Sequence, residues 1–185
     1  MTIKEVTTIF NQRIYQLTYP NLEVRTALNE NIFKYLLTDS SLPKMPILTA
    51  ILNKDMEKFK KEIYQLFASL PYNSYVNNDI QNYEGYYSNV MYSYFAGLGI
   101  QFIAEDVTNL GRVDLTIATP DMSQVYIIEF KVVDSKNQKG KALEQIKEKK
   151  YHEKYEDKAS ELIIIGMEFS KEDKNICKFE WEKIV

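Results

Sequence analysis

The sequence carries two opposite charges inside an otherwise apolar segment, residues 124–133 (QVYIIEFKVV). If the segment is a strand, alternation places Glu129 and Lys131 on one face together with valine and isoleucine side chains. Burying a carboxylate and an ammonium group is unfavourable unless each has a partner or lines a functional cleft. The pattern indicates a functional site, and it leaves open a structural ion pair or a solvent-exposed strip of a half-covered sheet.

A second carboxylate, Asp114, lies in the preceding strand-like segment, and Pro120-Asp121 supplies a turn between the two segments. An antiparallel hairpin closed at this turn would bring Asp114 beside Glu129. Adjacent carboxylates repel each other unless a proton or a cation lies between them. Because oxygen ligands suit Mg²⁺ or Mn²⁺, we predict a metal site here. Lys131 would stand beside the cation, where it could help to activate a water and stabilise charge on a phosphate.

The hydrophobic patterns predict the elements that would position these residues. Apolar residues at helical spacing predict helices at 24–37, 47–70, 84–98 and 141–155. Segments rich in β-branched and aromatic residues predict strands at 101–105, 112–118, 124–133, 161–166 and 179–184. The resulting order predicts an α/β fold with a central mixed sheet flanked by helices, in residues 81–185. Residues 1–80 are expected to form a mostly helical N-terminal segment, with a strand or hairpin piece at 7–17.

Composition narrows the class of protein. The formal net charge of -3 excludes a globally basic nucleic-acid binder. Residues 131–158 nevertheless contain nine lysines and six acidic residues, which suits either a solvated helix face or a strip that follows phosphates. One cysteine excludes an intramolecular disulfide, and one histidine excludes a His-rich zinc site. With no signal-peptide core and no apolar run of about 20 residues, a cytoplasmic protein without a membrane span is expected.

The spacing of Asp114 and Glu129-Phe130-Lys131 resembles the D-(x)n-E-x-K signature of the PD-(D/E)XK nuclease superfamily. Two further positions fit this resemblance. Glu84 opens the helix before the first strand, where many members carry an acidic residue. Gln145 lies in the helix after the third strand, where many members carry a supporting polar residue. The resemblance implies a restriction-endonuclease-like fold with an αβββαβ core.

A longer resemblance extends from about Thr2 to the end of the chain. The similar residues are 19–25, 111–114, 129–131, 142–146 and Tyr151. They resemble one bacterial family, in which a nuclease-like domain usually follows an AAA-type ATPase domain. Val113 replaces the usual proline of the signature, which should be harmless because a carboxylate binds the metal. No G-x-x-x-x-G-K-[ST] motif occurs, so this chain should not hydrolyse ATP alone.

The resemblance also implies roles for the residues. The side chains of Asp114 and Glu129 would bind the metal directly, and the carbonyl of Ile128 would supply an extra oxygen. Glu84 would bind through water or help to bind a second ion. Lys131 would position the attacking water, and Gln145 would contact Lys131, the water or a phosphate. Simpler explanations exist for two of these, since Glu84 would also complement the helix dipole and Gln145 could be an ordinary helix residue.

Two functions are compatible with these features. The first is a Mg²⁺- or Mn²⁺-dependent nuclease that hydrolyses phosphodiester bonds, with DNA as the expected substrate. The second is a catalytically silent nuclease-fold module for binding or assembly, which would work with an ATPase partner or domain. Carboxylates of Asp114 and Glu129 that converge beside an open groove would favour the nuclease. A closed site in which Lys131 neutralises Glu129 would favour the silent module.

Overall fold

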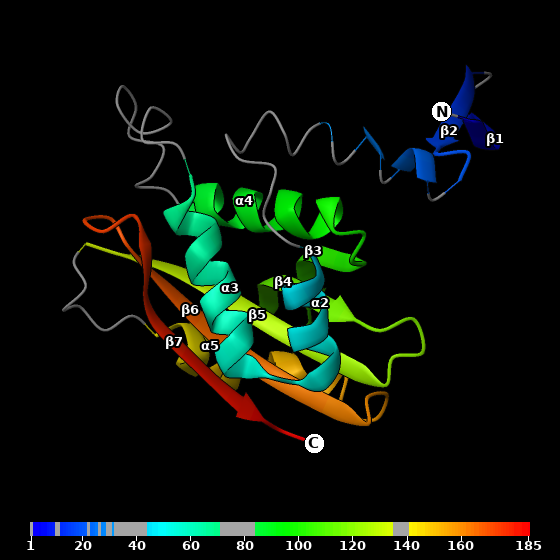
Figure 1. The fold of residues 1–185 in the computed structure, drawn as a ribbon. Helices are drawn as coiled ribbons and strands as arrows, with labels where there is room; N and C mark the ends of the chain where they lie inside the picture. Colours follow the sequence, from blue (N-terminus) through cyan, green and yellow to red (C-terminus); the bar gives the residue numbers. More distant parts are fainter. Residues whose placement is uncertain are drawn as a thin grey trace.

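The computed structural model describes residues 2–9, 12–21, 23–25, 27–28, 31, 44–70, 84–134 and 141–185. At its centre is a five-stranded sheet in the order β3-β4-β5-β6-β7 (Figure 1). β5 and β6 run parallel, and the other neighbours are antiparallel. The strands are β3 (Phe102–Thr108), β4 (Gly111–Ala118), β5 (Gln124–Val133), β6 (Glu161–Ser170) and β7 (Asn175–Lys183). The predicted α/β fold with a central mixed sheet is confirmed.

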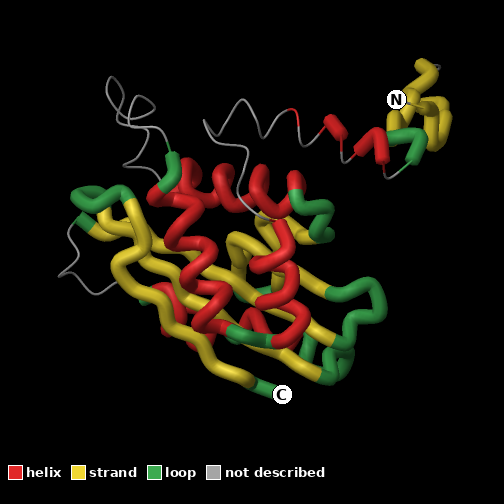
Figure 2. Tube along the Cα trace, viewed as in Figure 1, coloured by secondary structure: helices red, strands yellow, loops and turns green. Residues whose placement is uncertain are grey.

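Helices cover both faces of this sheet (Figures 1 and 2). One layer contains α2 (Lys44–Asn53), α3 (Met56–Ala68) and α4 (Glu84–Gly97). The other layer contains α5 (Ala142–Glu148) and the short 3-10 helix η3 (Tyr151–Lys154). The chain passes through α5 between the parallel strands β5 and β6, as a parallel pair requires a crossover connection.

Two hydrophobic cores fill the spaces between these layers. The α4-side core joins side chains of α2, α3 and α4 to those of Ile128 and Phe130 in β5. The α5-side core joins α5 and η3 to Val125 and Ile127 of the same strand. Successive residues of β5 therefore face opposite cores, because strand side chains alternate. Burial on both faces explains why β5 and β6 are nearly continuous apolar segments.

The single helix predicted at 47–70 is wrong, because the chain forms two helices there, α2 and α3. Lys54 adopts a left-handed conformation with φ of 58°, which ends α2. Asp55 then begins α3, since its carboxylate accepts a hydrogen bond from the Lys58 backbone N–H at 3.0 Å. An aspartate at this position is a helix-start signal that the apolar periodicity alone did not show.

Other predicted bounds also differ from the structure, since β7 begins at Asn175 rather than at residue 179 and β3 ends at Thr108 rather than at residue 105. The helix predicted at 141–155 ends at Glu148, and a left-handed Lys150 with φ of 50° separates it from η3. β6 continues past the predicted 161–166 to Ser170. Beyond Gly166, Glu168 interrupts the apolar pattern of the sequence. It is buried, and its Oε1 lies 3.8 Å from Lys178 Nζ.

The N-terminal residues form a separate antiparallel pair, β1 (Thr2–Ile9) and β2 (Gln12–Thr18). The strand or hairpin piece expected at 7–17 falls within this pair. The helix predicted at 24–37 lies largely outside the described residues. The division of the chain at residue 80 stays a prediction, and α2 and α3, on its N-terminal side, contribute to the α4-side core. In the described parts of the chain, no helix has the length and apolar character needed to cross a membrane.

Candidate active site

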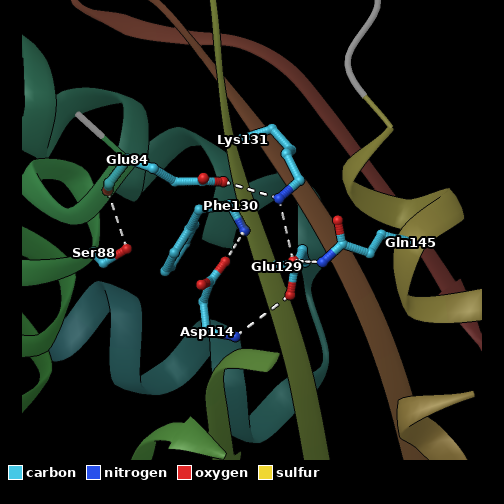
Figure 3. Close-up of polar contacts among 7 residues, drawn as sticks. All are labelled: Glu84, Ser88, Asp114, Glu129, Phe130, Lys131 and Gln145. Carbon is cyan, nitrogen blue, oxygen red and sulfur yellow. Dashed lines mark hydrogen bonds and ion pairs between the residues drawn. The ribbon is translucent and has the colours of Figure 1, made fainter. Parts of the chain in front are cut away.

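Asp114 and Glu129 come together from the adjacent strands β4 and β5, as the predicted hairpin requires. Pairing between these strands ends at Leu115 and Ile128, so the two acidic residues lie just beyond the last pair. Asp114 Oδ2 accepts a hydrogen bond from the Phe130 backbone N–H at 2.7 Å (Figure 3). Glu129 Oε2 in turn accepts one from the Asp114 backbone N–H at 3.4 Å. These side-chain to backbone bonds take the place of ladder bonds and hold the two carboxylates next to each other.

The other neighbour of Asp114, strand β3, is distorted at the same level. Pairing between β3 and β4 continues on both sides of Glu105 and Asp114, but these two residues are not partners. Glu105 has a φ of 55°, in the left-handed region that is unfavourable for residues with a side chain. Val113 belongs to the α5-side core and Leu115 to the α4-side core, so β4 turns over at Asp114. The distortion takes the backbone of Asp114 out of the β3–β4 ladder.

Lys131 joins Glu129 to a third carboxylate. Its Nζ lies 3.1 Å from Glu84 Oε1 and 3.4 Å from Glu129 Oε1. Glu84 is the first residue of α4, on the opposite layer from α5. On the α5 side, the Gln145 side-chain amide donates to Glu129 Oε1. The structure therefore brings together the five side chains singled out in the sequence, while their catalytic roles stay predictions (Figure 3).

Burial dominates the electrostatics of the acidic pair. Glu129 is only 2% exposed, and burial, followed by the negative charge of Asp114, raises its pKa to about 8. Burial likewise raises the pKa of Asp114 to about 6, although the Phe130 N–H opposes this. Desolvation lowers the pKa of Lys131, but the charges of Glu84 and Glu129 outweigh it and raise the value overall. The site thus holds three carboxyl groups for one ammonium group, and a bound cation would favour the ionised forms of these carboxyl groups.

These residues fit a hard divalent cation. Asp114 and Glu129 present oxygen ligands, and their raised pKa values reflect burial first and nearby negative charge second, both of which a cation would offset. Among the described residues, no group of three or more acidic, histidine or cysteine side chains is arranged to hold a metal, so remaining ligands would be backbone oxygens or water. Ile128 lies between Leu115 and Ile165 in the sheet, and its carbonyl stays a predicted ligand.

The site is closed toward the sheet and open on one side. Glu129 is buried, whereas Lys131 is 29% and Glu84 is 40% exposed. Lys131 and the beginning of α4 therefore form the side of the site that solvent reaches. Both outcomes weighed for the sequence stay predictions, since the acidic pair lies next to partly exposed residues while Lys131 also lies 3.4 Å from Glu129.

Two residues that the sequence analysis missed also shape the site. Tyr92 of α4 donates its hydroxyl to the Asp114 backbone carbonyl at 2.7 Å. Gly166 of β6 is the register partner of Glu129, and a Cβ at Gly166 would lie 2.9 Å from the Leu143 Cα. Glycine inside an apolar strand signals a close backbone approach, so Gly166 could have been noticed. One tyrosine among 14 gave no comparable signal.

Comparisons with known proteins agree with this geometry. Residues 82–179, more than half of the chain, match a family model described as the PD-(D/E)XK nuclease superfamily. The matched range includes all five side chains of the site. A protein of Azotobacter chroococcum mcd 1, described as an uncharacterized protein in the vnfD 5′ region, is 37% identical over 187 residues. That match covers 100% of this chain but 36% of the relative, so the chain spans little more than a third of its length. No solved structure matches the chain significantly.

Proposed function

Because the chain belongs to the PD-(D/E)XK nuclease superfamily, we propose that it hydrolyses phosphodiester bonds of nucleic acid with the help of Mg²⁺ or Mn²⁺, and that its substrate is DNA. The observation that carries the proposal is the placement of Asp114 beside Glu129, on adjacent strands, with Lys131 two residues further along β5. A buried carboxylate next to a half-buried carboxylate and a lysine is costly for stability, and a cation site gives this arrangement a function.

Each residue would have a distinct task. Asp114 and Glu129 would hold the cation, which when bound supplies the Lewis acid and water activator for phosphodiester hydrolysis. Lys131 would orient the attacking water and stabilise negative charge on the phosphate. Gln145 keeps Glu129 oriented through its amide, and Glu84 restrains Lys131 from the other side.

A silent module for binding or assembly is the second candidate function. It is favoured by the 3.4 Å contact in which Lys131 partly neutralises Glu129, and by the acidic net charge of -3. In this function the chain would work with an AAA-type ATPase domain or partner. The part of the Azotobacter relative that lies outside the match, about two thirds of its length, leaves room for such a domain.

Metal binding and DNA cleavage measured on the same variants would test the proposal. Binding of Mg²⁺ and Mn²⁺ would be followed by calorimetry, and cleavage by nicking of a supercoiled plasmid, for the wild type and for Asp114→Ala. Asp157→Ala removes an exposed carboxylate in a turn and serves as the matched control. We expect binding and cleavage to disappear together in Asp114→Ala and to persist in the control.

The other outcomes are equally informative. If the wild type binds metal but cuts neither plasmid nor single-stranded DNA nor RNA, the silent module is favoured. Absence of metal binding at millimolar concentration would contradict the nuclease. Cleavage that survives in Asp114→Ala would place the activity elsewhere.

A further inference from the structure

We propose that Tyr92 is a positioning residue for Asp114, whose backbone carbonyl it holds in place of the missing strand partner. The inference rests on the proposed role of Asp114 as a metal ligand. It is carried by the 2.7 Å hydrogen bond from Tyr92 Oη to the Asp114 carbonyl and by the interrupted pairing of Asp114 with β3.

The backbone of Asp114 needs partners because it has left the ladder. Buried peptide groups without a hydrogen bond are unfavourable, so a carbonyl released from strand pairing requires another donor. Tyr92 is that donor, while the N–H of Asp114 donates to Glu129 and its carboxylate accepts from the Phe130 N–H. Three hydrogen bonds thus fix Asp114. Two of them are with residues of β5, and the third comes from Tyr92 of α4.

The side chain of Tyr92 is itself held firmly. Its ring stacks on Phe102 of β3, with centroids 5.7 Å apart and planes 19° apart. Tyr92 follows Glu84 and Ser88 at intervals of four residues, so the three lie along one face of α4. One rigid helix therefore presents the carboxylate that binds Lys131 at one end and the hydroxyl that binds Asp114 two turns later.

The hydroxyl remains a hydrogen-bond donor at any pH suitable for an assay. Burial, followed by the charges of Asp114 and Glu105, raises the pKa of Tyr92 to about 12. Its contribution is geometric, because it fixes the peptide that carries the carboxylate. Residues that orient metal ligands in this way typically change metal affinity by about 10- to 100-fold when they are replaced.

The matched pair of variants is Tyr92→Phe and Tyr87→Phe. Both remove one hydroxyl from α4. Tyr87 is fully buried, and its hydroxyl has no hydrogen-bond partner among the described residues. Calorimetry with Mn²⁺ would measure affinity. Amide hydrogen exchange by NMR on the metal-free protein would follow the Phe130 N–H, which Asp114 Oδ2 binds, with the N–H of Ile165 in β6 as a reference for global opening.

We expect Tyr92→Phe to lower Mn²⁺ affinity about tenfold. It should also accelerate exchange at Phe130 more than at Ile165, and Tyr87→Phe should do neither. Wild-type affinity and wild-type exchange in Tyr92→Phe would overturn the inference. Equal acceleration at Phe130 and Ile165 would also overturn it, since that result indicates general loss of stability. If the wild type binds no Mn²⁺ but Phe130 responds selectively, the proposed function fails while Tyr92 still positions Asp114.

Discussion

Gly166 lies beside Glu129 in the parallel ladder between β5 and β6, and the backbone of α5 approaches it closely at Leu143. An added Cβ would be 2.9 Å from the Cα of Leu143, a distance that requires the α5 backbone to move. Gln145, two residues after Leu143, donates to Glu129. The missing side chain at one position therefore allows the helix to reach the carboxylate on the neighbouring strand.

Gly166→Ala should destabilise the protein by about 1–3 kcal/mol, because overpacking a close contact has this typical cost. It should also weaken the contact between Gln145 and Glu129. Urea unfolding would measure the change in the free energy of unfolding. Gly85→Ala is the control, since a Cβ at Gly85 meets nothing within 4 Å and alanine favours a helix by roughly 0.5–1 kcal/mol. Equal stability of Gly166→Ala and the wild type would contradict the close approach of α5.

Lys131→Met should separate metal binding from cleavage. The variant removes a positive charge 3.4 Å from Glu129, so Mn²⁺ affinity should be unchanged or higher. Cleavage should fall by about 10²- to 10³-fold, because a donor to the developing charge is lost. Lys147→Met, which removes a surface lysine paired with Glu182, should leave both quantities unchanged. Loss of metal binding in Lys131→Met would show that the lysine has another task.

Glu129→Gln should stabilise the metal-free protein in alkaline buffer. Folding raises the pKa of Glu129 to about 8, so its protonated form is favoured in the folded state. The stability associated with that proton is complete below the ordinary carboxyl pKa and is lost as pH rises through about 8. The variant avoids this loss. Urea unfolding with a chelator would measure the free energy of unfolding of Glu129→Gln and of the wild type. The difference in favour of the variant should be larger at pH 8.5 than at pH 4.5, by on the order of 1–3 kcal/mol.

The same variant should no longer bind Mn²⁺, since a neutral amide replaces a buried ligand. Stability and function would then change in opposite directions at one residue. If the wild type and Glu129→Gln depend on pH in the same way between 4.5 and 8.5, the raised pKa of Glu129 is wrong.

Metal affinity should rise with pH for the same reason. Below pH 8 Glu129 is mostly protonated in the metal-free protein, and a cation must displace this proton. Apparent Mn²⁺ affinity should increase by up to about tenfold per pH unit between pH 6 and 8, and level off above. Calorimetry in buffers of different ionisation enthalpy would count the protons released. Binding without proton release near pH 7 would contradict the prediction.

Local patterns were sufficient to predict the part of the fold that carries the chemistry. The alternation in QVYIIEFKVV predicted β5 with the bounds observed, and it placed Glu129 and Lys131 on one face. The turn after β4 predicted the hairpin that brings Asp114 to them. Strand alternation and turn residues can be recognised in a single sequence because they depend on neighbours within a few residues.

Contacts between distant segments explain what the sequence did not reveal. Tyr92 binds Asp114 across 22 residues, and the value of its hydroxyl depends on a strand distortion at Glu105 that no local pattern predicts. The break between α2 and α3 differs, because it carries a local signal, the carboxylate of Asp55 that accepts from the Lys58 N–H. Periodicity continued through this position and concealed the turn.

The α4-side core has a consequence for how the molecule unfolds. It contains side chains of α2 and α3 together with Ile128 and Phe130, which flank Glu129 in the strand that carries the site. Detaching the two helices would expose these residues to water, at roughly 1.5–3 kcal/mol for each large apolar side chain. The acidic pair is therefore built into a single cooperative unit. Cleavage of the chain before α2 by a protease should leave this cooperative unit folded. Cleavage between α3 and α4 that releases α2 and α3 should unfold the sheet as well.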